Sequence, residues 1–256
     1  MTDHVAVVTG ANRGIGAAIA LAFAREGYRV AATARDVTTL DGTVGAATGA
    51  AGSVEPIACD VRDEESVTAL AAAAQALGQV HVVVANAGIA GPTAPLHQVS
   101  LAQWRETIAT DLDGVFLTFR AFVPGMIERG SGSLIAISSM TGKRPLHGRT
   151  PYAAAKMGVI GLVRTLAVEL GPHGIRVNAV CPGAVAGPRI DDVIARQADA
   201  RGISVDEARR AFTDPSPLNR LVEADEVAAA CVYLASPAAS AITGEDLNVS
   251  AGVVMH

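Results

Sequence analysis

The chain has 256 residues, 50% of them hydrophobic, and a formal net charge of −5. That length and apolar content can bury one large core, and no basic block or acidic run points to nucleic-acid binding or a disordered tail. Three scattered cysteines, Cys59, Cys181 and Cys231, form no CxxC pair, so we expect reduced thiols, no disulfide and no metal site. The start of the chain lacks a signal-peptide pattern, and no apolar run approaches the roughly 18 residues of a membrane helix. We therefore expect a soluble, cytoplasmic protein.

The first expected element is a short apolar, β-branched run at residues 4–10, which is typical of a strand buried on both faces. An alanine-rich stretch that closes in a glycine then predicts a helix over residues 16–27. Residues 43–52 are rich in Gly and Ala and fit a weak helix or a loop. Further strands are predicted at residues 28–35, 53–60, 79–88, 132–139, 174–183 and 244–252. Further helices are predicted at residues 63–78, 100–130, 151–171 and 223–237.

This alternation of strands and helices indicates parallel βαβ units and a sheet covered on both faces. Neither a linker nor a repeat is visible, so we expect one α/β domain over residues 1–256. Residues 184–221 break the rhythm, because they are polar and Arg-rich and predict only one or two short helices. We interpret this segment as a substrate lid, since such loops often close over an active site.

The first strand ends in TGANRGIG, with Gly10, Gly14 and Gly16, and the next helix starts inside this motif. Backbone N–H groups at a helix N-terminus bind phosphate, and glycines let a pyrophosphate approach closely. The spacing is not GxGxxG, and a glycine turn needed only for tight packing is the alternative. The position at the first β-to-α junction favours a dinucleotide site.

The second strand ends in AATARD, which bears on the choice of cofactor. An NAD enzyme usually places an acid here for the ribose 2′-OH, whereas an arginine suits a 2′-phosphate. Ala34 stands where the acid would be, Arg35 follows it, and Arg13 could add a second cation. Because the guanidinium fork matches phosphate geometry, we favour NADP(H). The alternative is a solvated Arg35 next to Asp36, with NAD(H) as the cofactor.

A serine, a tyrosine and a lysine occur together in SSMTGKRPLHGRTPYAAAK, residues 138–156. Ser138 and Ser139 end a strand, so they lie at the carboxyl edge where open α/β sheets bind ligands. Tyr152 and Lys156 are four residues apart and share a helix face, where the ammonium would favour a phenolate. This set could exchange a proton with a substrate oxygen. Taken alone, the YAAAK stretch also fits an ordinary helix face.

These motifs, with NAG at 86–88, the Pro182–Gly183 pair and ITGEDLNVSAG, resemble the short-chain dehydrogenase/reductase family of the classical type. They span the chain in the family's order. The resemblance implies a single-domain Rossmann-type fold, that is, a doubly wound parallel sheet of about seven strands. It also implies reversible hydride transfer between NADP(H) or NAD(H) and a carbonyl or secondary alcohol. No metal is implied.

The resemblance also assigns roles to individual residues. Tyr152 would be the general acid/base, Ser139 would orient the carbonyl, and Lys156 would favour the phenolate and bind the nicotinamide ribose. Asp60 resembles an adenine contact, and Val185 resembles the residue whose backbone meets the nicotinamide carboxamide. The implied cofactor-binding residues are Gly10, Asn12, Arg13, Gly14, Ile15, Gly16, Arg35, Asp60, Val61, Asn86, Ala87, Gly88, Tyr152, Lys156, Pro182, Gly183 and Val185.

Two positions depart from the family's pattern. Asp111 stands where the family commonly has an asparagine, a fourth catalytic member thought to shape a helix kink and a water relay to the lysine. An ionised Asp111 accepts hydrogen bonds but cannot donate them, and we expect activity to survive. Gly187 stands where the family often has a threonine that contacts the cofactor, so that contact is expected to be missing, or the loop to run differently.

The leading hypothesis is an NADP(H)-linked alcohol dehydrogenase or ketone reductase that acts on a small molecule. An NAD(H)-linked enzyme and a non-catalytic, cofactor-binding regulatory protein are the alternatives. The resemblance implies a homo-oligomer, a tetramer or dimer, assembled through the helices that hold Trp104 and Tyr152. The sequence does not identify the substrate.

Four basic side chains lie between Ser139 and Tyr152, namely Lys143, Arg144, His147 and Arg149. In the family that it resembles, this stretch borders the substrate pocket, so an anionic substrate group could pair with one of these cations. The alternative is that they face solvent or a partner subunit.

Overall fold

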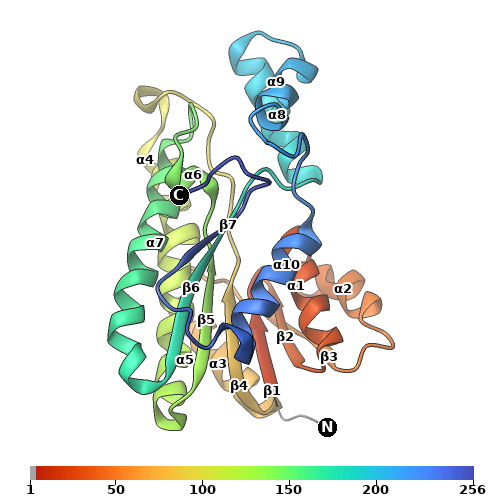
Figure 1. Ribbon diagram of the computed structural model, residues 1–256, viewed down its shortest axis with the longest axis vertical. Coiled ribbons are helices and arrows are strands. Elements are labelled where there is room, and N and C mark those ends of the chain that lie inside the picture. Colours follow the sequence, from red (N-terminus) through yellow and green to blue (C-terminus); the bar gives the residue numbers. More distant parts are fainter. Residues whose placement is uncertain (1–3) are drawn as a thin grey trace.

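The computed structural model describes residues 4–256; residues 1–3, which form part of the chain start read above for a signal peptide, lie outside that description. In residues 4–256, seven parallel strands form one sheet in the order β3-β2-β1-β4-β5-β6-β7 (Figure 1). The strands are β1 (His4–Val8), β2 (Arg29–Ala34), β3 (Ser53–Ala58), β4 (Gln79–Ala85), β5 (Gly132–Ile137), β6 (Ile175–Pro182) and β7 (Asp246–Val249). The expected Rossmann-type, doubly wound sheet is confirmed.

Helices cover both faces of this sheet, as the alternation predicts. Their starts follow local sequence signals: Asp63 accepts a hydrogen bond from Glu65 N, and Ser100 forms a capping box with Gln103. The α-helices are α1 (Gly14–Arg25), α2 (Asp41–Ala46), α3 (Glu64–Leu77), α4 (Leu101–Ile108), α5 (Gly114–Arg129), α6 (Met140–Lys143), α7 (Thr150–Leu170), α8 (Pro188–Arg201), α9 (Val205–Thr213) and α10 (Ala224–Ala235).

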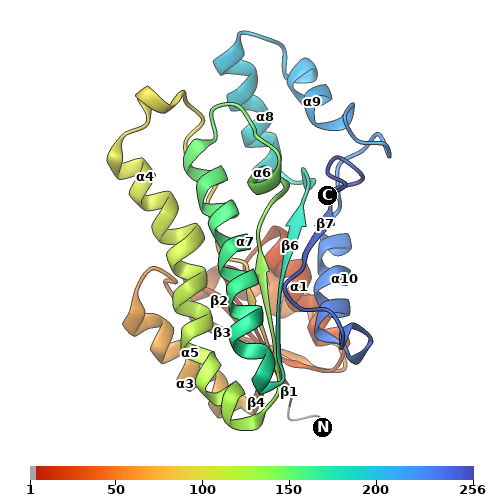
Figure 2. The same ribbon diagram turned by 60° about the vertical axis from the view of Figure 1, so that its left-hand side comes forward.

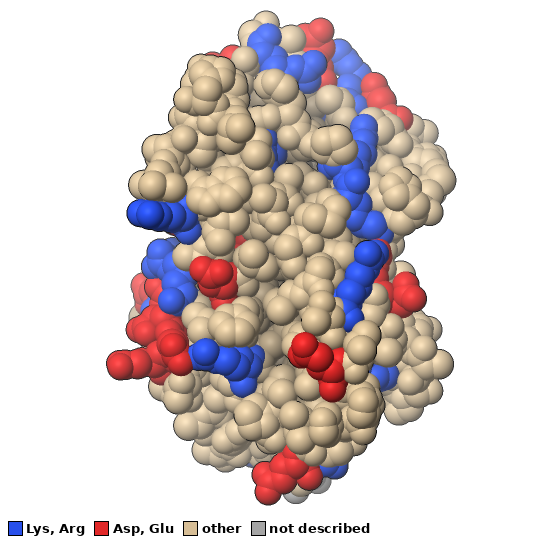
Figure 3. Space-filling model, turned by 90° about the vertical axis from the view of Figure 1, so that its left-hand side faces the viewer, with Lys and Arg blue, Asp and Glu red and all other residues tan. Residues whose placement is uncertain are grey.

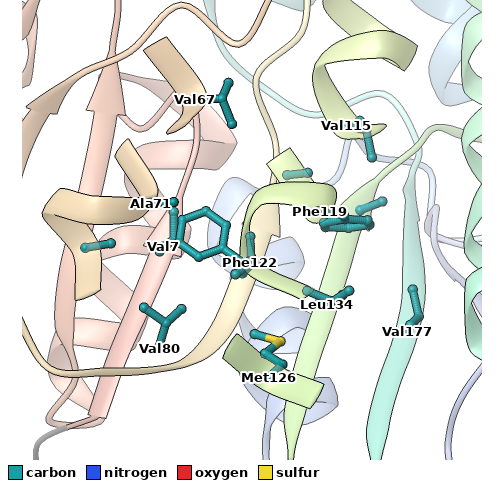
Figure 4. Packing of buried hydrophobic residues seen from close by; sticks show 14 of the residues in the cluster. Val7, Val67, Ala71, Val80, Val115, Phe119, Phe122, Met126, Leu134 and Val177 are labelled. Carbon is teal, nitrogen blue, oxygen red and sulfur yellow. The ribbon is translucent and has the colours of Figure 1, made fainter. Parts of the chain in front are cut away.

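Two apolar cores result, one on each face of the sheet. On one face, α1 and α10 pack together against the strands; on the other, α3, α5 and α7 bury their apolar stripes. Figure 4 shows Phe119, Phe122 and Met126 of α5 beside the strands, with Leu134 of β5 between Phe119 and Met126. Strands buried on both sides need continuous apolar sequence, which accounts for the short Val- and Ala-rich runs.

Some elements differ from the sequence expectations. The stretch 100–130 forms two helices joined by a π-helical turn, Ala109–Asp113, instead of one continuous helix. The short α6 follows β5 where no helix was predicted. Residues 184–221 contain two helices, and α8 has 14 residues, so it is not short. No helix in the described part of the chain has both the length and the apolarity needed to cross a membrane.

The topology brings several loops to the carboxyl edge of the sheet. The chain runs outward from β1 to β2 and β3, then returns to place β4 on the other side of β1. Loops after β1 and β4 therefore separate at this switch point, where open α/β sheets bind their ligands. The helices α8 and α9 lie beyond the same edge, next to α6 (Figure 2).

Candidate active site

The glycine loop after β1 divides its three glycines between packing and open space. A Cβ on Gly16 would lie 2.1 Å from the Gly10 oxygen, and one on Gly10 would lie 2.9 Å from Ala87 Cα. Gly14 has φ +55°, and a Cβ there would meet nothing within 4 Å. Two glycines therefore let the chain pack closely, whereas Gly14 leaves room at the N-terminus of α1 for an anionic ligand.

A hydrogen-bond network fixes this loop to the end of β4. The buried Thr9 hydroxyl accepts hydrogen bonds from the Asn86 and Ala87 backbone N–H groups, both at 3.0 Å. The Asn86 side-chain amide donates to the Thr9 and Gly10 carbonyls at 2.9 and 3.1 Å. The Asn86 side chain thus holds the loop in shape. Sequence reasoning missed Thr9, although its place directly before Gly10 was a usable signal.

Exposed charges surround the end of β2, where the adenosine half of a dinucleotide would lie. Arg35 is exposed and Ala34 is buried beside it. The carboxylate of Asp36 accepts hydrogen bonds from the Thr38 N–H and hydroxyl at 3.0 and 2.7 Å, which lowers the pKa of Asp36. Because this carboxylate caps its own turn, it is less suited to be a ribose ligand.

Asp60 lies near Arg35 and carries the charge at the end of the next strand. Its carboxylate forms a 2.6 Å ion pair with Arg62, and this hydrogen bonding holds the pKa of Asp60 below its usual range. The charge of Arg35 acts in the same direction. Val61 is buried and a Cβ on Gly114 would meet its side chain at 2.8 Å, so Val61 packs against α5. Arg62 was not identified from the sequence.

The candidate catalytic residues meet where β5 and α7 come together. The Lys156 ammonium is buried, donates to the Ile137 carbonyl at 3.0 Å and lies 5.6 Å from the centre of the Tyr152 ring. Ser138 and Ser139 have different roles: the Ser138 hydroxyl donates to the Lys156 carbonyl at 2.8 Å, tying β5 to α7. Ser139 stands at the end of β5 and accepts from the Thr141 N–H at 3.1 Å.

Asp111 lies in the π-helical turn and is completely buried. Its Oδ1 accepts a hydrogen bond from the Ile89 N–H at 2.7 Å, and its Oδ2 lies 3.5 Å from Lys156 Nζ. Oδ2 has no hydrogen-bond partner. A Cβ on Gly88 would meet this carboxylate at 3.3 Å, so the glycine of the NAG motif gives Asp111 room. The carboxylate therefore balances the buried lysine and anchors the loop after β4.

The basic residues between Ser139 and Tyr152 do not share one environment. Lys143 is half-buried, with its side chain 8% exposed, and forms a 2.5 Å ion pair with Asp246, so it joins α6 to β7. Arg149 is 3% exposed; its guanidinium carbon lies 4.9 Å from the Tyr152 ring centre, and it donates to the Ala90 carbonyl. For these two residues, the expectation that they point to solvent is wrong. Burial lowers the pKa of Arg149.

The strand β6 delivers Pro182 and Gly183 to the same edge. Gly183 N donates to the Val249 carbonyl at 2.9 Å, and a Cβ there would lie 2.9 Å from Ser250 Cα. Val185 forms an isolated parallel bridge with Val222, whose hydrogen bonds are made by Ala184 and Ala186. The backbone groups of Val185 itself consequently face the opposite side. Gly187 has φ +127° and precedes α8.

A cavity of about 290 Å³ opens between the α6–α7 loop and the helices α8 and α9. Its wall begins at Met140 and Thr141, directly after Ser139 in the chain. The rest of the wall consists of Arg144, Pro145, Leu146, His147, Gln197, Arg201, Ala211 and Phe212. Between residues 4 and 256, no group of three or more His, Cys, Asp or Glu residues is arranged to hold a metal ion.

The fold and the residues at the carboxyl edge of the sheet first indicate the class of this protein. It is an α/β protein with a dinucleotide-type glycine loop and a Ser–Tyr–Lys set at the same edge. The model of a family described as enoyl-(acyl carrier protein) reductase matches residues 10–254. The chain is 40% identical to the cis-4-hydroxycyclohexanecarboxylate dehydrogenase of Sinomonas cyclohexanicum, covering 98% of this chain and 96% of that one. The chain belongs to the short-chain dehydrogenase/reductase family, and it is an oxidoreductase acting on alcohol or ketone groups.

Solved structures agree with this assignment. A variant of the actinorhodin polyketide ketoreductase, solved with NADPH, superposes with a TM-score of 0.92 at 37% identity, covering 98% of each chain. An NAD⁺-bound xylitol dehydrogenase superposes with a TM-score of 0.94 at 25% identity, covering 98% of this chain and 99% of that one. These relatives include one bound to NADPH and one bound to NAD⁺.

Proposed function

We propose that this protein interconverts a carbonyl group and a secondary alcohol with NADP(H), with Tyr152 as the general acid/base. The observation that carries the proposal is the arrangement of Tyr152 and the buried Lys156, 5.6 Å from ring centre to Nζ, at the carboxyl edge that also presents Ser139. Ligands in open α/β sheets bind at that edge.

Each residue has a distinct task in this mechanism. Ser139 donates a hydrogen bond to the substrate oxygen and orients it. Tyr152 transfers a proton to that oxygen during reduction and accepts one during oxidation, and the adjacent Lys156 charge stabilises its phenolate. A nicotinamide cofactor, when bound, would supply or accept the hydride. Asp111 holds Lys156 in place through its carboxylate and, through Ile89 N, sets the loop after β4.

The residues present fit a dinucleotide along this edge. The open space at Gly14 suits a pyrophosphate at the N-terminus of α1, with Asn12, Arg13 and Ile15 in the same loop. The adenine would lie against Asp60 and Val61. The nicotinamide half would lie against Gly88, Pro182, Gly183 and the backbone of Val185.

NADP(H) is favoured over NAD(H) because of the charge at the end of β2. Arg35 is exposed there, while Asp36 is engaged with Thr38. A 2′-phosphate would gain charge-assisted hydrogen bonds from Arg35. The NADPH in the related ketoreductase structure supports this choice, and the NAD⁺ in the xylitol dehydrogenase structure keeps the NAD(H)-linked enzyme as the alternative.

The direct test is absorbance at 340 nm with purified protein, either reduced or oxidised cofactor, and a panel of ketones and secondary alcohols. We expect cofactor-dependent turnover of at least one pair. Tight cofactor binding without turnover of any panel member would instead support the non-catalytic, cofactor-binding alternative.

We also propose that the protein is a homo-oligomer, a tetramer or dimer. Along the side of the molecule formed by α4, α5 and α7, large apolar side chains are exposed. Figure 3 shows a broad uncharged area in the upper and middle part of this face, with charged side chains along its margins and in its lower part. The exposed apolar residues there are Leu101, Phe116, Ile127, Met157 and Val168. Such a face is typical of an interface, and light scattering during size-exclusion chromatography would measure the assembly. The 184–221 segment, through α8 and α9, would close over the substrate.

A further inference from the structure

Two arginines converge on the candidate acid/base. The guanidinium carbon of Arg149 lies 4.9 Å from the centre of the Tyr152 ring, and that of Arg189, in the first turn of α8, lies 6.0 Å from it. They come from segments far apart in the chain, the α6–α7 loop and the 184–221 segment, which Figure 2 shows at the same end of the molecule. Sequence reasoning did not identify Arg189.

Neither the buried Arg149 nor the exposed Arg189 has a carboxylate partner in the described part of the chain. Among residues 4–256, the ion pairs include neither Arg149 nor Arg189. Asp111 is the carboxylate whose charge reaches Arg149, yet it lies 3.5 Å from Lys156 Nζ. The buried Nε of Arg149 has no hydrogen-bond partner. Isolated buried charge is costly, so this arrangement calls for an anion supplied from outside the chain.

Neighbouring positive charges add to the lack of negative charge around Arg149. Arg189 and Arg196, both exposed on α8, act unfavourably on the charge of Arg149. Arg189 also stands at the N-terminal end of its helix, where the dipole disfavours a cation and favours an anion. Its one hydrogen bond, to the Gly88 carbonyl at 3.3 Å, leaves several of its N–H groups for a ligand.

The cavity between the α6–α7 loop and the helices α8 and α9 is also lined by basic side chains, although its lining includes neither Arg149 nor Arg189. Its wall contains the basic residues Arg144, His147 and Arg201 and no Asp or Glu. The Gln197 side chain also lines it; this residue is 6% exposed, and its amide nitrogen is buried without a hydrogen-bond partner. Because that nitrogen is itself buried, the basic side chains of the wall, and not Gln197, are the groups that can meet an anionic ligand.

We propose that the substrate of this enzyme carries an anionic group, a carboxylate or a phosphate ester, which Arg149 and Arg189 bind beside Tyr152 while the reacting carbonyl faces Ser139. This inference rests on the proposed function, since it assigns a substrate class to the same site. Two guanidinium forks from opposite segments would bring the 184–221 segment onto the bound substrate. Binding the anion would thus complete the active site.

The test compares matched anionic and neutral substrates with NADPH. The keto acids acetoacetate, levulinate and 4-oxocyclohexanecarboxylate are each paired with their primary amides, and dihydroxyacetone phosphate is paired with dihydroxyacetone. We expect wild type to favour at least one anion over its neutral partner by about tenfold or more in kcat/KM. If a keto acid is preferred over its amide, the anionic group is a carboxylate. If dihydroxyacetone phosphate is preferred over dihydroxyacetone, the anionic group is a phosphate ester.

Three variants then locate the effect. Arg189→Gln is expected to lower kcat/KM for the favoured anion by about 10- to 100-fold, from the loss of charge-assisted hydrogen bonds, and to change the neutral partner by less than about threefold. Arg149→Gln also removes a charge 4.9 Å from the Tyr152 ring, so it is expected to lower turnover of both partners, and of the anion by about tenfold more. Arg210→Gln, which removes an exposed charge on α9, is the control and is expected to change neither. If Arg149→Gln does not fold, the result for Arg189→Gln alone tests the inference, because Arg189 is exposed.

The outcomes separate this inference from the proposed function. Turnover of neutral ketones with no anion preference, or equal losses for both members of a pair, overturns the inference and leaves the function standing. Weaker NADPH binding by Arg189→Gln with an unchanged anion preference assigns Arg189 to the cofactor and overturns it as well. If no substrate is turned over, calorimetry on the NADPH-bound protein tests the inference by comparing cyclohexanecarboxylate with its amide. Only the carboxylate is expected to bind, and it should bind more weakly to Arg189→Gln than to wild type.

Discussion

Two ion pairs at the carboxyl edge of the sheet have similar chemistry and very different surroundings. At the adenosine end, Asp60 and Arg62 lie 2.6 Å apart with side chains 31% and 37% exposed. At the catalytic end, Asp111 and Lys156 lie 3.5 Å apart and are 0% and 4% exposed. Exposed pairs contribute little to stability, whereas removing one member of a buried pair leaves a charge without solvent. Charges at the two ends should therefore respond differently to substitution.

The largest expected effect of that contrast is on stability. Lys156→Met leaves the Asp111 carboxylate buried alone and should cost about 3–5 kcal/mol in the free energy of unfolding. Arg62→Met, the matched change at the exposed pair, should cost at most about 1 kcal/mol. Urea unfolding followed by circular dichroism measures both.

A second variant isolates the cause of that loss. Lys156→Met combined with Asp111→Asn removes both charges and keeps an oxygen acceptor for Ile89 N. It should recover most of the lost stability but remain inactive. Equal destabilisation in the single and double variants would show that packing of the lysine stem, and not the unpaired charge, dominates.

The next largest effect is expected on cofactor preference, from substitutions at Ala34 and Arg35 at the end of β2. Ala34→Asp combined with Arg35→Ser should invert the preference from NADP(H) to NAD(H), because the acid repels a 2′-phosphate and the fork that binds it is lost. We expect the ratio of kcat/KM for the two cofactors to change by about 10- to 100-fold. A wild-type enzyme that already favours NAD(H) tenfold would contradict the role of Arg35.

The smallest effect on turnover is expected from Asp111→Asn. Asparagine keeps an oxygen acceptor for Ile89 N, supplies a donor and removes a negative charge 3.5 Å from Lys156. The lysine charge would then act more strongly on Tyr152, so kcat should stay within about threefold of wild type or rise. Steady-state kinetics checks this, and complete inactivation would reveal a specific role for the carboxylate.

Much of this site follows from sequence because its parts are local. The strand–loop–helix at Gly10–Gly16 and the four-residue spacing of Tyr152 and Lys156 each lie within one continuous stretch, where period and spacing determine which groups share a face. The family resemblance then supplied the relation between these stretches. Ser100 and Asp63 likewise mark their helix starts by local capping.

What the sequence could not supply are contacts between distant segments. The partners Lys143 and Asp246 are 103 residues apart, and nothing local distinguishes that lysine from an exposed one. Arg149 and Arg189 meet at Tyr152 only because the 184–221 segment folds back over the edge. The residue pattern of 100–130 alone reads as continuous helix, and only the family resemblance pointed to a kink at Asp111. The structure shows a π-helical turn there, which places Asp111 against Ile89 and Lys156.

The most direct test of the central claim is turnover by Tyr152→Phe beside wild type, with NADPH binding measured by fluorescence on the same preparations. Since the phenylalanine ring can occupy the same space, binding should change little. Loss of the proton-transfer group should lower kcat by roughly 10²–10⁴-fold. A variant that keeps more than about a tenth of wild-type kcat would contradict the assignment of Tyr152 as the general acid/base.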